Sequence, residues 1–213
     1  QTLTISVVVC AKNEVSNLNK LIPLLLDQEY KSFELVLIND GSNDETLEVM
    51  TRFQKQNSKI KIVNVKNNEA FWANKKYALT LGIKAATNEH LLFTDADCIP
   101  SSKKWIQEMS SHFTESKTII LGYGAYKTKK NSFVNLMIRF ETLIAAIQYF
   151  SYAKLGSPYM AVGRNLAYTK SEFFRVNGFL NHMKILSGDD DLFIRDAATS
   201  DNTDIALNSN SFT

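Results

Sequence analysis

The chain has 213 residues, 45% of them hydrophobic, so it can bury a full core without disulfide or metal staples. Its 24 basic and 22 acidic residues are spread along the whole length and give a net charge of +2. No basic patch typical of a duplex-binding protein stands out, which excludes nucleic acid as an expected partner. Cys10 and Cys98 form no Cys-x-x-Cys pair, so neither zinc nor redox chemistry is expected. The small number of cysteines fits a protein of a reducing, cytoplasmic compartment.

Length also sets the expected domain organisation, which is one domain over residues 1–213. No uninterrupted apolar run reaches the roughly 18 residues that a membrane-spanning helix requires, so we expect the chain as given to be soluble. It begins at Gln1 without an initiator methionine, which indicates a segment excised from a longer protein.

In chain order, short runs rich in β-branched residues alternate with longer segments of helical period. This alternation predicts an α/β fold with a Rossmann-like, mostly parallel central sheet flanked by helices. The predicted strands lie near residues 4–10, 33–39, 60–65, 89–94 and 118–126. The predicted helices lie near residues 15–28, 44–56, 73–86 and 101–114. Asp44 and Ser101 are expected N-caps, and Pro23 predicts a kink or break in the first helix.

Beyond residue 132, apolar residues recur at three- and four-residue spacing, which predicts one long amphipathic helix. The apolar positions are Phe133, Leu136, Met137, Phe140, Leu143, Ile144, Ile147 and Phe150. We expect this stripe to face the core. The preceding basic residues Lys127, Lys129 and Lys130 leave open a second interpretation, an interfacial helix that lies on a membrane.

Polar residues follow three of the predicted strands, at the points where those strands end. They are Ala-Lys-Asn-Glu at 11–14, Asp-Gly-Ser at 40–42 and Asp-Ala-Asp at 95–97. Ligands of open parallel sheets bind beyond the carboxyl ends of the strands. We therefore expect these three segments to share one rim and to form the binding site.

Asp95 and Asp97 are two carboxylates separated by one residue, directly after a buried strand. Such a pair can hold a hard divalent cation that also binds phosphate oxygens. The alternative is a solvated loop with an N-capping aspartate, and the strand context favours the metal. Asp40 fits an ordinary turn, but in a nucleotide site its carboxylate can accept a base N–H bond of about 1.5–3 kcal/mol.

Three consecutive acids, Asp189, Asp190 and Asp191, precede a segment of helical character. Because adjacent carboxylates repel one another, the pKa of at least one should rise, which suits a base that works near neutral pH. A charged helix N-terminus explains the same pattern, and the two interpretations are compatible.

Several common motifs are absent from the sequence. Gly122 and Gly124 lack the third glycine of a dinucleotide fingerprint, and there is no Walker loop and no Gly-x-Ser-x-Gly elbow. The three histidines, His90, His112 and His182, are too scattered for a histidine-based metal site. Carboxylates are therefore expected to carry the chemistry.

Four segments combine these features. They are Val-Val-Val-Cys-Ala-Lys-Asn-Glu at 7–14, Leu-Val-Leu-Ile-Asn-Asp-Gly-Ser-Asn-Asp at 35–44, Leu-Leu-Phe-Thr-Asp-Ala-Asp at 91–97 and Ser-Gly-Asp-Asp-Asp-Leu at 187–192. In order and spacing, over nearly the whole chain, they resemble glycosyltransferase family 2. The resemblance implies a GT-A fold, an inverting mechanism, Mg²⁺ or Mn²⁺ as cofactor and a nucleoside diphosphate sugar, by family expectation a UDP-sugar, as donor.

The same resemblance assigns roles to individual residues. Those implied to line the nucleoside pocket are Ala11, Asn13, Glu14 and Asp40. Asp95 would contact the ribose side of the donor, Asp97 would hold the metal, and Lys75 would face the donor, although Asn74 replaces the usual glycine before it. Residues 1–97 would thus form the donor-binding half and residues 98–213 the acceptor side.

The catalytic base of the family lies in a Gly-Asp-Asp or Glu-Asp pair. If the family motif is aligned on Gly188, the base is Asp190. If the motif is aligned on Asp191 and Leu192 instead, the base is Asp189. The segment Gly-Arg-Asn-Leu-Ala-Tyr at 163–168 is similar to one that borders donor and acceptor in relatives, with Arg164 where a small residue is usual.

The resemblance also implies partners and a location. The expected acceptor is a glycan or a lipid-linked glycan in polysaccharide or glycolipid synthesis. Membrane association through segments outside this chain would put the full-length protein at the cytoplasmic face of the inner membrane. Two alternatives remain: a non-catalytic nucleotide-sugar-binding domain, and a sugar-nucleotide nucleotidyltransferase, which would carry a glycine-rich loop at 11–14.

Overall fold

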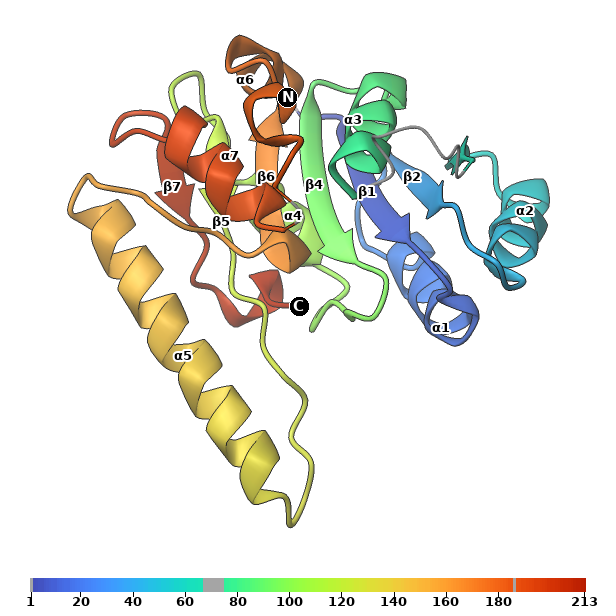
Figure 1. Cartoon of the computed structure of the whole chain (residues 1–213), viewed down its shortest axis with the longest axis horizontal. Helices are drawn as coiled ribbons and strands as arrows, with labels where there is room; N and C mark the ends of the chain where they lie inside the picture. Colours follow the sequence, from blue (N-terminus) through green and yellow to red (C-terminus); the bar gives the residue numbers. More distant parts are fainter. Residues whose placement is uncertain (1, 67–74, 186) are drawn as a thin grey trace.

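The computed structural model describes residues 2–66, 75–185 and 187–213. In this part of the chain, the central sheet has seven strands in the order β3-β2-β1-β4-β6-β5-β7 (Figure 1). The strands are β1 Ile5–Ala11, β2 Phe33–Asp40, β3 Ile60–Val65, β4 His90–Asp95, β5 Ile119–Leu121, β6 Leu166–Thr169 and β7 Thr203–Ile205. The helices are α1 Val15–Leu26, α2 Thr46–Gln56, α3 Lys75–Ala85, α4 Trp105–Ser110, α5 Phe133–Lys154, α6 Lys170–Arg175 and α7 Asp189–Ala197.

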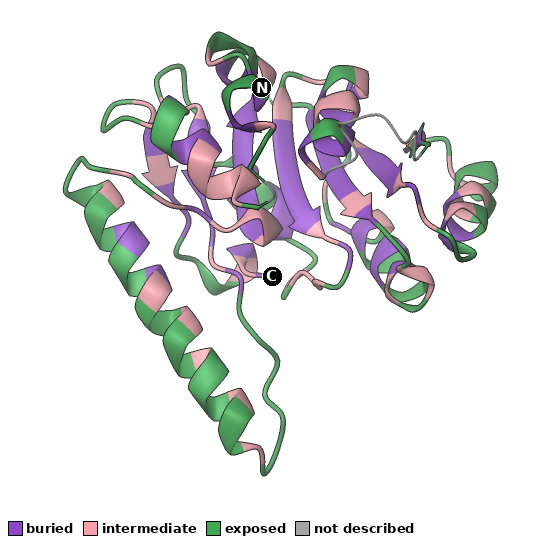
Figure 2. Cartoon of the chain, viewed as in Figure 1, coloured by how far each residue is buried: buried purple, intermediate pink, exposed green. Residues whose placement is uncertain are grey.

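Helices cover both faces of the sheet, as the predicted α/β class requires. Successive residues of β1 alternate between two core clusters, because side chains of a strand point to opposite faces. Val7 and Val9 pack with α1, α2 and α4, whereas Val8 packs with α3, α6, α7 and the C-terminal end of α5. Both faces of the strands are therefore buried, which explains their continuous apolar runs (Figure 2).

The register of the parallel strands brings three strand ends together. Cys10 of β1 pairs with Asp95 of β4, and Ala11 pairs with Asn39 of β2. The polar segments that follow β1, β2 and β4 consequently lie at one edge of the sheet, as predicted. The four long strands themselves begin and end within one residue of their predicted positions.

The second half of the sheet was less accessible to prediction. The expected strand 118–126 is only β5, three residues long, because the chain leaves the sheet after Leu121. β6 pairs antiparallel with both β4 and β5, and neither β6 nor β7 is predicted from the sequence. Strands of three or four residues are too short to display a period, so only their long-range pairing defines them.

Details of three helices also differ from the predictions. α4 covers Trp105–Ser110 instead of 101–114, and Ser101 donates its hydroxyl to the Ser209 carbonyl instead of capping a helix. Glu45 takes the N-cap position of α2, although Asp44 accepts the Thr46 N–H at 3.0 Å. α1 continues through Pro23 without a break and ends three residues later, at Leu26.

The predicted long helix forms as α5, but its predicted orientation is wrong. Of its residues, Ala146, Tyr149 and Phe150 are buried. Phe133 is 75% exposed and Phe140 56% exposed, so most of the apolar stripe faces away from the core. In Figures 1 and 2, α5 extends away from the sheet and the helices that cover it, and most of its surface is exposed. By length and composition, this helix is apolar enough to cross a membrane, although Arg139 and Glu141 interrupt its apolar run.

Candidate functional site

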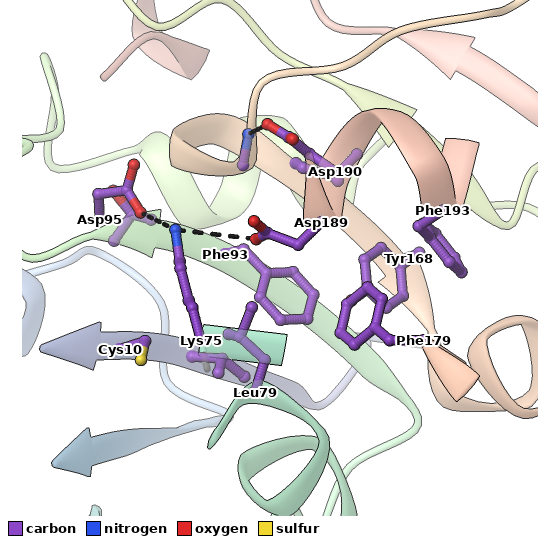
Figure 3. Close-up of a pocket in the computed structure, with 14 residues that line it drawn as sticks. Cys10, Lys75, Leu79, Phe93, Asp95, Tyr168, Phe179, Asp189, Asp190 and Phe193 are labelled. Carbon is purple, nitrogen blue, oxygen red and sulfur yellow. Dashed lines mark hydrogen bonds and ion pairs between the residues drawn. The ribbon is translucent and has the colours of Figure 1, made fainter. Parts of the chain in front are cut away.

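A pocket opens at the edge of the sheet where the strand ends meet (Figure 3). Its polar lining comes from the ends of β1 and β4, the start of α3, the turn after residue 162 and the start of α7. The polar lining residues are Cys10, Lys75, Thr94, Asp95, Gly163, Asp189 and Asp190. Its apolar lining residues are Val8, Leu79, Phe93, Leu166, Tyr168, Phe179 and Phe193. Charged groups thus converge over a floor of packed aromatic and aliphatic side chains.

Lys75 connects the two acidic sides of this pocket. Its Nζ lies 3.1 Å from Asp95 Oδ1 and 3.8 Å from Asp189 Oδ2 (Figure 3). Burial lowers the pKa of Lys75, but the nearby carboxylates more than offset this, so the pKa lies above its ordinary value. The side chain is therefore protonated at neutral pH, between the end of β4 and the start of α7.

The three consecutive aspartates begin α7, and the structure separates their surroundings. Gly188 precedes them with φ of 74°, a left-handed conformation that glycine adopts without strain. Asp190 Oδ2 accepts the Gly163 N–H at 2.7 Å, and its Oδ1 accepts the Asp191 N–H at 3.0 Å. Asp189 and Asp190 line the pocket, whereas Asp191 does not. The geometry therefore leaves two of the three as candidates for chemistry in the pocket.

The predicted rise in pKa within this triplet is confirmed in direction. Burial raises the pKa of Asp190, the Gly163 N–H partly opposes this, and the charge of Asp189 adds to the rise. The pKa of Asp191 also rises, first through burial and then through Asp190. Desolvation thus contributes more than the mutual repulsion from which the rise was predicted.

Asp95, Asp97 and Cys98 form a compact group whose ligand atoms all lie within 4.8 Å of one another. Burial and the adjacent Asp97 raise the pKa of Cys98 to about 12, so its thiol stays protonated at neutral pH and is a poor ligand. The two carboxylates remain as donors, and oxygen is the ligand that Mg²⁺ and Mn²⁺ prefer. The donor set thus fits a hard divalent cation.

The loop after β1 and the loop after β2 are tied together. Asn13 has φ of 59°, its N–H donates to Ser42 Oγ at 3.0 Å, and its Oδ1 accepts the Asn43 N–H at 2.8 Å. The Glu14 N–H donates to Thr46 Oγ1 at 2.8 Å. These bonds explain why both loops run along the same rim.

The remaining predicted residues differ in accessibility. Asp40 ends β2 near Cys10, whose pKa is raised to about 12, first by burial and then by the charge of Asp40. Ala11 is buried and its side chain packs in the core, so only its backbone is available to a ligand. Asn74 lies outside the described residues, as does the beginning of the predicted helix 73–86.

Two features of the site were not predicted. The Gly163 N–H holds Asp190, a contact that only the tertiary structure creates. Lys76 is 1% exposed, and its Nζ donates to the carbonyls of Ile185 at 2.8 Å and Ser187 at 2.9 Å. It therefore holds the chain just before the aspartates. Lys76 lies three residues before the buried Leu79, so helical periodicity puts this lysine on the apolar face of α3. That position is the sequence signal that could have indicated its burial.

A comparison of the sequence with protein families gives a match to the model described as Glycosyl transferase family 2, over residues 6–180. The matched range runs from the second residue of β1 through β6 and thus includes most of the rim. It ends before the aspartates of α7.

Curated relatives are similar over a large part of the chain. An uncharacterized glycosyltransferase of Haemophilus influenzae is 28% identical over 68% of this chain and 41% of its own length. The 4,4'-diaponeurosporenoate glycosyltransferase of Staphylococcus haemolyticus is 25% identical over 84% of this chain and 48% of its own length. The chain therefore spans less than half the length of these two relatives.

Solved structures show the same architecture. The mannosyltransferase PcManGT from Pyrobaculum calidifontis, in complex with GDP-Man and Mn²⁺, superimposes with a TM-score of 0.68 at 17% identity, over 90% of this chain and 50% of that one. S. aureus TarS 1-349 in complex with UDP-GlcNAc gives a TM-score of 0.65 at 17% identity, over 95% and 56%. The predicted GT-A fold is thereby confirmed. Together with the family match over residues 6–180, this identifies the chain as a member of glycosyltransferase family 2.

Proposed function

We propose that this chain is the catalytic domain of an inverting glycosyltransferase, which transfers a sugar from a nucleoside diphosphate donor to an acceptor hydroxyl. The observation that carries the proposal is the position of Lys75 between Asp95 and Asp189. It joins the rim of the parallel strands, where an anionic nucleotide would bind, to the acidic start of α7. Membership of the family and the nucleotide sugars in the two solved structures support the same reaction class.

On the donor side, each group has a role that suits its surroundings. Asp40, Asn13 and Glu14 lie on the loops where a nucleoside would bind, with the Ala11 backbone beneath them. Asp95 would accept hydrogen bonds from the ribose. Lys75 would offset the negative charge of the diphosphate, because its raised pKa keeps it protonated at neutral pH. The proposed donor base is uracil.

The proposed metal ligand is Asp97, with Asp95 beside it, and the ion would be Mg²⁺ or Mn²⁺. When bound, such an ion stabilises the negative charge that grows on a leaving diphosphate. The solved structure with Mn²⁺ supports this assignment by analogy of fold.

Asp190 is the proposed base. Its carboxylate would take the proton from the acceptor hydroxyl while that oxygen attacks the anomeric carbon and the bond to the diphosphate breaks, so the sugar inverts in a single displacement. The Gly163 N–H holds Oδ2 in place. The raised pKa makes Asp190 a stronger base than an exposed aspartate, which suits it to this step.

A groove beside the pocket is the proposed approach for the acceptor, a glycan or a lipid-linked glycan. Tyr123, Tyr126, Tyr149 and Arg164 contribute to its lining, and α5 forms one wall. Arg164 donates from Nε to the Gly124 carbonyl at 3.1 Å and stacks over the Tyr126 ring at 5.0 Å. It directly follows Gly163, whose N–H donates to the proposed base, so the groove lies next to the pocket that contains this base. An arginine in place of a small residue would narrow this entrance.

Isothermal titration tests the donor site directly. UDP, GDP and CMP are each titrated into the protein with Mn²⁺ and again with EDTA, on the unaltered chain, on Asp97→Ala and on the exposed control Asp201→Ala. We expect metal-dependent binding of one diphosphate that is lost in Asp97→Ala and retained in the control. Absence of binding to all three nucleotides would overturn the proposed donor site.

The alternative, a nucleotide-sugar-binding module without catalysis, requires a turnover measurement. Release of free nucleoside diphosphate from the bound donor, abolished by Asp190→Asn, supports the transferase. Donor binding with no release in the presence of glycan acceptors favours the module. No observation on this chain favours a nucleotidyltransferase, whose glycine-rich loop is absent at residues 11–14.

A further inference from the structure

The outward face of α5 is almost entirely apolar. Residues at spacings of three and four share one side of a helix, and here that side points away from the body. We define it as the apolar stripe: Phe133, Leu136, Met137, Phe140, Leu143, Ile144 and Ile147, all exposed. The opposite side makes the internal contacts, since Tyr149 Oη donates to the Gly122 carbonyl and Asn135 Nδ2 to the Lys127 carbonyl. The helix is thus held with its apolar side turned outward.

An exposed apolar surface of this kind indicates an interaction site. Soluble monomers rarely leave a contiguous apolar patch over several helical turns in contact with water, because its exposure costs free energy and promotes association. The stripe belongs to one continuous helix, and Figure 2 shows that helix exposed along most of its length. Something in the environment of the protein is therefore expected to cover it.

Positive charge near the N-terminal end of α5 indicates what covers the apolar stripe. Lys127, Lys129 and Lys130 are exposed in the segment that leads into the helix. Between Glu115 and Glu141, the sequence contains no acidic residue. Positive charge beside an apolar helix face matches an anionic bilayer, whose phosphate groups lie next to its hydrocarbon layer. A second copy of this chain would bring the same positive charge instead.

The packing of α5 distinguishes lying on a bilayer from crossing it. Its C-terminal half is anchored in the core through Ala146, Tyr149 and Phe150. Arg139 and Glu141 lie in its middle, where burial in hydrocarbon would be costly. A helix fixed to the body on one side and apolar on the other can rest in the interface without leaving the fold.

We propose that α5 docks this protein on an anionic membrane surface, with the apolar stripe in the boundary between headgroups and acyl chains. Lys127, Lys129 and Lys130 then contact lipid phosphates. This inference does not rest on the proposed transferase activity, because it concerns another surface of the molecule and is tested by lipid binding.

Vesicle co-sedimentation tests the proposal. The protein is incubated with vesicles of phosphatidylcholine alone and of phosphatidylcholine mixed with phosphatidylglycerol, and we expect binding to the mixed vesicles. Replacing Phe133, Phe140 and Ile147 together by serine should weaken binding at least about tenfold. The matched control replaces Leu24, Leu180 and Leu207, which are exposed elsewhere, by serine and should bind as the unaltered chain does.

A second pair of variants tests the charge. Replacing Lys127, Lys129 and Lys130 by glutamine should weaken binding at least about tenfold, because three positive charges that attract the anionic surface are lost. The control replaces exposed lysines of other helices, Lys20, Lys55 and Lys84, in the same way. Circular dichroism and thermal melts check that every variant folds.

Three results would overturn the proposal. One is absence of binding to both vesicle types, and another is equal binding to both, which would remove the role of negative lipid charge. The third is a dimer in sedimentation velocity that disappears in the serine variant of the apolar stripe while vesicles are not bound, since a second copy would then cover the stripe.

Discussion

Neighbouring residues of the aspartate triplet have different surroundings, and their expected contributions differ accordingly. Asp189 faces Lys75, Asp190 accepts two backbone N–H groups, and Asp191 has an oxygen, Oδ1, that is buried without a hydrogen-bond partner among the described residues. Adjacent residues of a helix point about 100° apart, so three identical side chains in sequence cannot share one environment. The proposed base is the one fixed by the turn at Gly163.

Replacement of Asp190 by asparagine is predicted to abolish turnover while the fold persists. Loss of a general base typically costs 10²–10⁴-fold in rate, so we expect kcat to fall by about that range. The melting temperature should stay the same or rise, because the raised pKa of Asp190 means that its ionised form is disfavoured in the folded protein at neutral pH. Steady-state kinetics and thermal melts measure both.

Asp201→Asn, at an exposed aspartate, serves as the control and should leave kcat unchanged. If Asp190→Asn remains active and Asp189→Asn does not, the base is Asp189, and the assignment to Asp190 is wrong.

The acidic limb of the pH–rate profile should report the same residue. The base works only when deprotonated, so kcat/KM should fall as the pH decreases through the pKa of the proposed base. Because burial raises the pKa of Asp190 above 3.8, this fall is expected at a higher pH than for an ordinary aspartate. A profile that stays flat down to the pKa of an exposed aspartate would contradict the role of a buried carboxylate.

At the scale of elements, α3 supports both sides of the site with consecutive lysines. Lys75 points into the pocket, whereas Lys76 points into the body and holds the two carbonyls before α7. One turn of helix therefore sets the distance between the rim of the sheet and the aspartates. We describe Lys76 as a positioning residue, because it acts through the chain that it holds.

Replacement of Lys76 by methionine tests this coupling. Methionine keeps the apolar stem but removes two hydrogen bonds from a charged donor, each of which typically contributes about 1.5–3 kcal/mol. This loss of stability is offset in part, because the variant no longer buries a charge. We expect kcat to fall by about tenfold or more with little change in nucleotide affinity, a split that kinetics and titration together resolve.

The control for this experiment is Lys84→Met, at an exposed position of the same helix. Equal losses of kcat and nucleotide affinity in Lys76→Met would point to general destabilisation of α3 instead of loss of positioning.

At the scale of the whole molecule, Asn165 joins segments that are far apart in sequence. It is fully buried, its Oδ1 accepts Trp105 Nε1–H at 3.0 Å, and its Nδ2 donates to the carbonyls of Tyr123 at 2.9 Å and Ser211 at 2.7 Å. These bonds link α4, the chain after β5 and the last residues to the start of β6. They also fix the turn that carries Gly163.

Asn165→Ala is therefore predicted to lower the free energy of unfolding by about 3 kcal/mol or more, since three buried hydrogen bonds are lost and Trp105 Nε1–H is left without its acceptor. Chemical denaturation measures this loss. Asn19→Ala, at an exposed asparagine of α1, should stay within about 0.5 kcal/mol of the unaltered chain. Comparable values for the two variants would show that the buried network contributes little.

Sequence alone determined the elements whose signal is local. The long strands carry continuous apolar runs, so β1 through β4 and the polar segments at their ends were predictable, and so was the resemblance to the family. The convergence of Asp40, Asp95 and Asn13 at one rim follows from parallel pairing alone, because parallel strands place their carboxyl ends on the same side.

Tertiary structure decided everything that depends on contacts between distant residues. Period and composition predict that α5 is a helix with an apolar stripe, but not which side of it the body covers, and the stripe proved to face outward. The antiparallel β6, the two carbonyls to which Lys76 donates and the contact of Gly163 with Asp190 likewise have no local signature. Each arises when segments separated by many residues pack together, and the free energy of that packing is not encoded in any short stretch of the chain.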